Sequence, residues 1–190
     1  MYFTLEDNPN FKSFQYVIDV PNICGLDTDS NGKPIINVFK KLLIYFGELG
    51  ISEDKIISYA DSSFYYVVND RIEYKNLIRA KKIINVPAGI KSDIAIISFC
   101  LKNTDARIIS NDLFREYYSS LPRNWILNKR IVILMVKEEF YLIPMLFNKY
   151  KKGFRCEEGK SQISNKNREQ NFNIFEIEIF EKELEQNSMR

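Results

Sequence analysis

Four apolar, strand-like runs in this chain each end on a carboxylate or amide side chain. They occupy residues 17–22, 57–61, 91–93 and 108–112. In an open parallel sheet the carboxyl ends of the strands lie along one edge, so acids far apart in the sequence converge at one crevice. Convergent carboxylates suit a hard cation that keeps some of its waters, and Mg²⁺ or Mn²⁺ is the natural occupant.

The chain contains no histidine. This excludes imidazole acid–base chemistry, Ser-His-Asp triads and histidine-containing zinc sites. The three cysteines, Cys24, Cys100 and Cys156, are far apart and lack C-x-x-C spacing, which argues against structural zinc and against a disulfide framework. We expect a cytoplasmic protein, because separate thiols indicate a reducing compartment and no signal peptide or membrane-spanning run is visible.

Apolar periodicity divides residues 1–146 into alternating strands and helices. Strands are predicted at residues 15–20, 55–60, 83–86, 106–109 and 131–136, with a hairpin partner at 140–142. Helices are predicted at residues 35–49, 69–82, 93–102 and 113–120, and loops at 21–34 and around Trp125. This alternation predicts a three-layer α/β/α domain with a mostly parallel, doubly wound central sheet.

The pattern changes in residues 147–190, which we treat as a separate extension. Residues 148–168 carry seven Lys or Arg side chains against two Glu, so this basic stretch is a candidate contact for a polyanion. Residues 172–184 alternate apolar residues with acids, which fits a strand at the start and a helix at the end. This last segment is expected to be an added edge element or a contact between copies in a homo-oligomer.

Four motifs resemble a known family. They are VIDVPN (17–22), YADSSFYYVVND (59–70), VPAGIKSD (86–93) and RIISNDLFREY (107–117). Their order and spacing resemble those of Regnase-type ribonucleases, whose NYN domain has a PIN-like fold, and the resemblance extends over about residues 14–143. The pattern SNDxFRxY after a β-branched run, with an acid about 20 residues upstream, is the most specific part.

The resemblance implies a metal-dependent endoribonuclease, a hydrolase that acts on single-stranded or loop RNA. By this comparison Asp19 is the family's first acid, Asn22 its paired amide and Asp93 the acid that opens a helix. Asp112 matches the acid of the SND motif, and Glu116 falls where the family often has Asp.

Two positions depart from the family pattern. Many members have a second acid where this chain has Ser92, and a small residue where it has Pro21. No adjoining zinc-finger pattern is present. These departures keep open an alternative from another class, a catalytically silent RNA-binding or scaffold module. An Asp-nucleophile phosphatase ranks last, because the first strand lacks a D-x-D pair.

The residue types also make chemical sense without the family. Phosphodiester hydrolysis needs a nucleophile at neutral pH and neutralisation of the phosphate oxygens, and bound Mg²⁺ supplies both. We expect Asp19, Asp93 and Asp112 to hold one or two ions. Glu116, four residues after Asp112 on a predicted helix, would orient a metal-bound water, and Ser110 would hydrogen-bond a carboxylate.

Candidate substrate contacts are Asp61, Lys91, Ser110 and Arg115. Each has a structural alternative, since acids at strand ends and helix starts commonly act as caps or turn residues, and isolated surface cations are usually only solvated. The aromatic run at residues 64–66 is expected either to stack on RNA bases or to fill the core.

Overall fold

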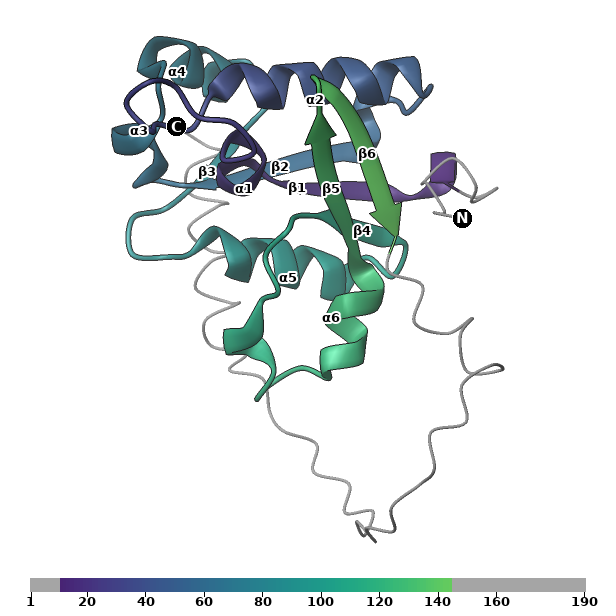
Figure 1. Cartoon of the computed structure of the whole chain (residues 1–190). Helices are drawn as coiled ribbons and strands as arrows, with labels where there is room; N and C mark the ends of the chain where they lie inside the picture. The colour runs from purple at the N-terminus through teal and green to yellow at the C-terminus, as the bar shows by residue number, and fades with distance from the viewer. Residues whose placement is uncertain (1–10, 145–190) are drawn as a thin grey trace, which may run out of the picture.

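The computed structural model describes residues 11–144 (Figure 1). The basic stretch, the acidic-apolar segment and the proposed domain boundary near residue 146 lie outside the described residues. Within the described part, no helix is both long and apolar enough to cross a membrane.

A six-stranded sheet forms the centre of the domain, in the order β3-β2-β1-β4-β5-β6. The strands are β1 (Gln15–Asp19), β2 (Ile56–Asp61), β3 (Ile84–Val86), β4 (Ala106–Ile109), β5 (Arg130–Val136) and β6 (Glu139–Pro144). The first five pair in parallel, and β6 returns antiparallel to β5 through a tight hairpin. The structure therefore confirms the predicted mostly parallel α/β sheet.

Helices cover both faces of the sheet (Figure 1). They are α1 (Val20–Cys24), α2 (Ile36–Glu48), α3 (Phe64–Val67), α4 (Arg71–Arg79), α5 (Ser92–Lys102) and α6 (Arg123–Lys129). Three 3₁₀ turns, η2 (Phe11–Ser13), η3 (Glu53–Lys55) and η4 (Arg115–Tyr117), complete the described elements. Helices α2, α3 and α4 lie on one side of the sheet, and α5 and α6 lie on the other.

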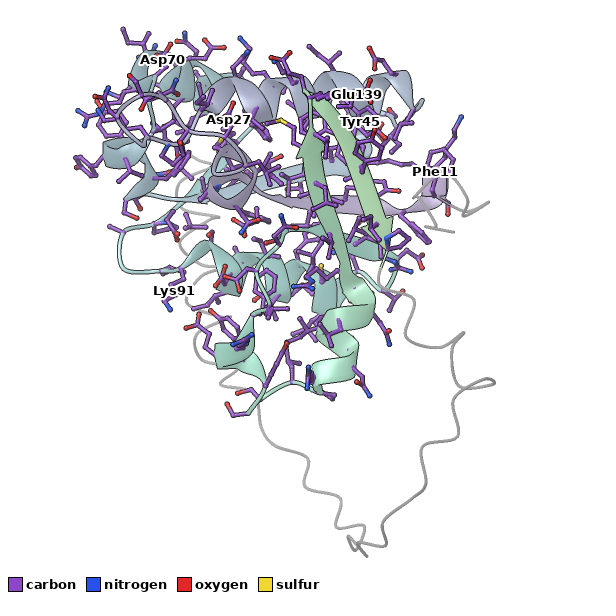
Figure 2. All side chains as sticks on the ribbon, in the orientation of Figure 1. Phe11, Asp27, Tyr45, Asp70, Lys91 and Glu139 are labelled. Carbon is purple, nitrogen blue, oxygen red and sulfur yellow. The ribbon has the colours of Figure 1, made fainter. Side chains whose placement is uncertain are left out.

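Side-chain alternation along β1 explains how one strand serves both layers. Tyr16 and Ile18 pack in the core with α2, whereas Val17 packs in the core with α5. Because successive side chains of a strand point to opposite faces, a central parallel strand must be apolar on both faces, and all three residues are fully buried. Side chains fill the space between the sheet and each helical layer (Figure 2).

Two neighbouring polar residues set the starts of two helices. The side chain of Asp70 accepts hydrogen bonds from the backbone N–H groups of Ile72 and Glu73, at 3.0 and 2.9 Å, and so caps α4. Asn69 acts on a different helix, since its Oδ1 accepts from the N–H of Ile36 at 2.9 Å, where α2 begins. This side chain ties α2 to the segment that precedes α4.

Several local predictions were wrong. The loop predicted at 21–34 begins inside a short helix, α1, in which Pro21 occupies the first turn, where its missing N–H costs nothing. The helix predicted at 113–120 is reduced to η4, because Phe114 adopts the left-handed conformation at φ 51° and interrupts it. Trp125 lies in a helix, α6, rather than in a loop.

Candidate active site

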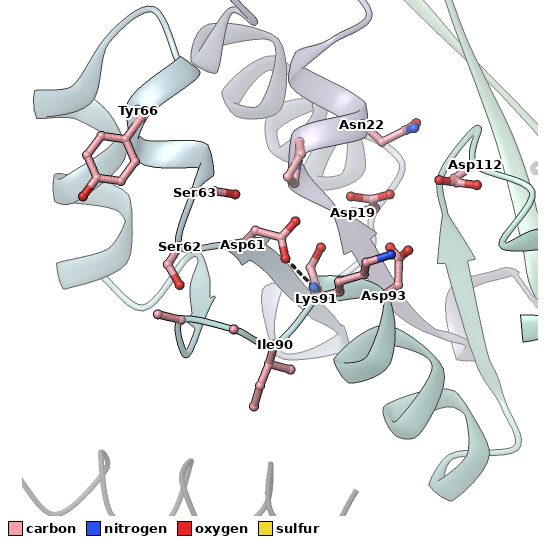
Figure 3. A pocket seen from close by; sticks show the side chains of 14 residues that line it. Asp19, Asn22, Asp61, Ser62, Ser63, Tyr66, Ile90, Lys91, Asp93 and Asp112 are labelled. Atoms are coloured by element: carbon pink, nitrogen blue, oxygen red, sulfur yellow. Dashed lines mark hydrogen bonds between the residues drawn. The ribbon is translucent and has the colours of Figure 1, made fainter. Parts of the chain in front are cut away.

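A cavity of about 800 Å³ opens at the carboxyl ends of the central strands (Figure 3). It lies where the strand order reverses between β1 and β4, the place where open α/β sheets bind ligands. Most of the lining residues are polar, and they come from the ends of β1 and β2 and from the segments that follow β1, β2, β3 and β4. The lining residues are Asp19, Pro21, Asn22, Asp61, Ser62, Ser63, Tyr66, Ala88, Gly89, Ile90, Lys91, Ser92, Asp93 and Asp112.

Asp19 is the last residue of β1 and is only 5% exposed. Its Oδ2 accepts a hydrogen bond of 2.8 Å from the hydroxyl of Ser110, the residue that follows the neighbouring strand β4. Burial raises the pKa of Asp19 to about 6; the Ser110 bond opposes this shift, and the charge of Asp112 adds to it. A carboxylate that is buried beside like charge is stabilised by a bound cation.

The loop after β4 is held by side chains that bond to its backbone. The Ser110 hydroxyl that donates to Asp19 also accepts from the N–H of Asp112 at 3.0 Å. Asn22, on α1, accepts from the N–H of Asn111 at 2.8 Å, and Asp112 accepts from the N–H of Phe114 at the same distance. Asn22 therefore connects the loop to α1, and Ser110 connects it to Asp19.

Two residues that position Asp112 were not among the candidate site residues predicted from the sequence. The Asn111 amide donates to the carbonyl of Ile133 and accepts from its N–H, at 2.8 and 2.9 Å, so it continues the pairing of β4 with β5. Buried Arg130 donates from Nη1 to the carbonyl of Asp112 at 2.6 Å. Asn111 was visible within the SND motif, whereas the only signal for Arg130 was a charge directly before an apolar run.

Asp93 and Asp61 come from the other side of the cavity. The Oδ1 of Asp61 accepts from the N–H of Ser92 at 2.6 Å, so the acid that ends β2 caps the start of α5. This contact fixes the first turn of α5, which carries Asp93. Burial, and then the charges of Asp19 and Asp112, raise the pKa of Asp93 to about 7.

Glu116 does not occupy the position that the sequence predicted. No helix connects it to Asp112, because of the left-handed Phe114, and neither Glu116 nor Arg115 lines the cavity. Glu116 instead accepts two bonds from the Lys91 ammonium, at 2.7 and 3.0 Å, and this lowers its pKa. Its charge still contributes to the raised pKa of Asp93, so Glu116 belongs to the electrostatic surroundings of the site.

The donor set suits a partly hydrated divalent cation. The carboxylates of Asp19, Asp93 and Asp112 line the same cavity, and the raised pKa values of the first two reflect burial and negative charge that is not balanced locally. Within residues 11–144, however, no three acidic, cysteine or histidine side chains are close enough to form a preassembled metal cluster. Oxygen ligands that reach the ion partly through water are typical of Mg²⁺ sites.

Comparisons with known proteins identify the fold. The sequence matches no protein-family model, and it matches no curated protein. Two structures of nuclear protein-only RNase P 2 (PRORP2) from Arabidopsis thaliana are similar, with TM-scores of 0.52 and 0.53 and sequence identities of 14% and 16%. Each comparison covers 70% of this chain and 30% of that chain. The chain therefore has a PIN-like α/β fold, and the likeness does not single out the Regnase type.

Proposed function

We propose that this protein is a metal-dependent endoribonuclease that hydrolyses phosphodiester bonds of single-stranded or loop RNA, as in Regnase-type enzymes. The observation that carries the proposal is the meeting of Asp19, Asp93 and Asp112, from three separate segments, in one cavity at the switch point of the sheet. The fold similarity to a protein-only RNase P supports the same class of chemistry.

In this proposal the three acids hold Mg²⁺ or Mn²⁺, which when bound activates water and neutralises charge on the phosphate. The residues around them keep the carboxylates in place. Ser110 fixes the orientation of Asp19, while Asn22 and Arg130 hold the loop that presents Asp112. Lys91 lies at the same cavity and would contact a phosphate oxygen when its bond to Glu116 opens.

The test is Mg²⁺- or Mn²⁺-dependent cleavage of an end-labelled, unstructured RNA by the wild-type protein and by Asp19→Asn and Asp112→Asn. Each substitution removes charge with little change in shape, so cleavage should fall by about a hundredfold or more. Asp105→Asn is the matched control, because Asp105 is exposed and precedes the amino-terminal end of β4, at the end of the strand away from the cavity. Near wild-type rates in both site variants would contradict the assignment.

A second candidate is a silent RNA-binding module with the same fold. The lack of a preassembled carboxylate cluster among the described residues favours it, as does Ser92, which stands where many relatives of the proposed type have an acid. In this structure the Ser92 side chain is buried, and its N–H is bonded to Asp61. RNA binding without cleavage at any tested Mg²⁺ or Mn²⁺ concentration would select this candidate.

A further inference from the structure

Tyr66 is the most exposed aromatic side chain among residues 11–144, with 67% of its surface accessible. Its two neighbours in the sequence pack differently: Phe64 is 3% exposed in the core, and Tyr65 is half-buried. An exposed large aromatic ring next to a polar cavity is an informative exception to the usual burial of such residues. Tyr66 is therefore the residue of this run whose ring is most accessible to a ligand.

The cavity joins Tyr66 to the acids. Tyr66 lines the same cavity as Asp19 and Asp112, and in Figure 3 it lies at the end opposite Asp112, with Asp61 and Ser63 between them. The lining also includes the apolar residues Ala88 and Ile90. A strand of nucleic acid with one phosphate at the acids would therefore carry a neighbouring base towards Tyr66.

The backbone around Tyr66 is held in place before any ligand binds. Its N–H donates to the carbonyl of Ser63 at 3.0 Å, and its carbonyl accepts from Arg71 at 2.9 Å. Its ring meets the ring of Tyr65 edge to face, with centroids 5.3 Å apart. A ring that is already positioned loses little conformational entropy when a ligand binds to it.

Positive charge lies beside this pair of rings. The Lys75 ammonium is 4.7 Å from the centre of the Tyr65 ring, and the Arg71 guanidinium is 5.4 Å from it. Aromatic rings flanked by cations are typical of surfaces that bind single-stranded nucleic acid, where rings stack on bases and cations contact phosphates. Both features occur here at the edge of the acidic cavity.

We propose that Tyr66 stacks on an unpaired base of the RNA strand whose phosphate lies at Asp19, Asp93 and Asp112. The proposal rests on the proposed function and narrows its substrate: the base near the cleaved bond must be free of a pairing partner. Lys75 contacts the backbone of the same strand. Duplex RNA cannot make the stacking contact, because its bases are already paired and stacked.

The test uses the full chain in EDTA, so that binding is measured without cleavage. The probe is a hexauridylate RNA with a single 2-aminopurine, whose fluorescence falls when the base stacks on an aromatic ring. Wild-type protein and Tyr66→Phe should quench the probe equally. Tyr66→Leu should abolish quenching and weaken binding by about five- to a hundredfold, the range for loss of one base–aromatic stack. The matched control is Tyr141→Leu on β6, also an exposed tyrosine, which should behave as wild type.

Two further measurements test the phosphate contact of Lys75 and the requirement for an unpaired base. Lys75→Gln should keep full quenching at saturation but lower the salt dependence of binding by about 0.7 log units, as expected for one lost phosphate contact. With the 2-aminopurine placed inside the stem of an RNA hairpin, wild-type protein and Tyr66→Leu should bind equally. Quenching by Tyr66→Leu that equals the wild-type value, or binding by wild-type protein without quenching, overturns the proposal.

The stacking role and the nuclease activity can fail independently. If wild-type protein quenches the probe but never cleaves RNA with Mg²⁺ or Mn²⁺, the nuclease function is wrong and the stacking role stands. If it cleaves RNA while Tyr66→Leu and wild-type protein bind and quench alike, the stacking role is wrong and the nuclease function stands.

Discussion

The acids that end β1 and β2 are held by different kinds of partner. On the β2–α5 side, the Asp61 carboxylate bonds to a backbone N–H and caps a helix. On the β1–β4 side, Asp19 is buried, and the loop N–H groups near it are taken by Ser110 and Asn22. The carboxylate that ends β2 is therefore bonded to the backbone of a helix start, whereas the carboxylate that ends β1 is bonded to a side-chain hydroxyl.

The largest effect on stability is expected from Arg130. Replacing it with Met leaves the carbonyls of Asn111 and Asp112 without this donor and should cost about 2 kcal/mol of unfolding free energy. Urea denaturation measures the loss, and Mn²⁺ titration of the folded variant should show weaker binding. The control is Arg123→Met, at an exposed position on α6. Equal stability of the two variants would show that the β1–β4 side does not depend on Arg130.

A second effect concerns pH in metal-free protein. The pKa of Asp93 in the folded protein is raised to about 7, so folding favours the protonated carboxyl group. The free energy of unfolding that this group adds at acidic pH is lost as the pH rises through about 7. In urea denaturation at pH 7.5, Asp93→Asn should therefore have a higher free energy of unfolding than wild type. The expected difference is about 1–2 kcal/mol, which allows for the partial exposure of Asp93. The difference should disappear near pH 4, and Asp105→Asn should show no such trend. A destabilised Asp93→Asn at pH 7.5 would mean that the carboxylate is needed for structure.

A third prediction separates capping from chemistry at Asp61. Asp61→Ala removes the acceptor for the Ser92 N–H and should lower stability by about 1 kcal/mol. Asp61→Asn keeps an acceptor oxygen at the same place, so stability and metal-dependent cleavage should both remain close to wild type. If Asp61→Asn loses cleavage as severely as Asp19→Asn, the acids that end β1 and β2 are chemically equivalent and the contrast between them is wrong.

The smallest effect is expected at Glu116. Glu116→Gln breaks an exposed ion pair with Lys91 and should leave urea denaturation unchanged within error. Because Glu116 does not line the cavity, Mn²⁺ affinity should fall less than in Asp112→Asn. Equal losses of affinity in the two variants would assign Glu116 a direct place beside the ion.

The sequence was sufficient to predict those helices and strands whose residue pattern repeats locally. Apolar runs marked all six strands of the described sheet, and helical periodicity marked α2 and α4, because burial of one helix face requires it. Helix α5 was predicted from a run that is apolar all round. The acids Asp19, Asp93 and Asp112 were found because parallel strands end at one edge, and the structure brings them to one cavity.

The sequence failed where a single backbone conformation or a distant contact decided the outcome. The i, i+4 spacing predicted a helix that would carry Asp112 and Glu116 on one face, but one left-handed residue, Phe114, prevents it. Arg130 lies 18 residues from the carbonyl of Asp112 that it holds, and nothing in its local sequence indicates that partner. The cap of α5 likewise comes from Asp61, 31 residues away.

Hydrogen exchange at the Ile133 N–H reports on the loop that carries Asp112, because the Asn111 side chain is bonded to Ile133. The N–H of Ile133 is bonded to a side chain of the loop and not to the backbone of a neighbouring strand. Its exchange with deuterated water therefore requires the loop to open, while the adjacent hairpin of β5 and β6 stays paired. Native-state hydrogen exchange at this one amide would report how often the loop that carries Asp112 leaves its place, and slower exchange on addition of Mn²⁺ would follow site assembly without any RNA present.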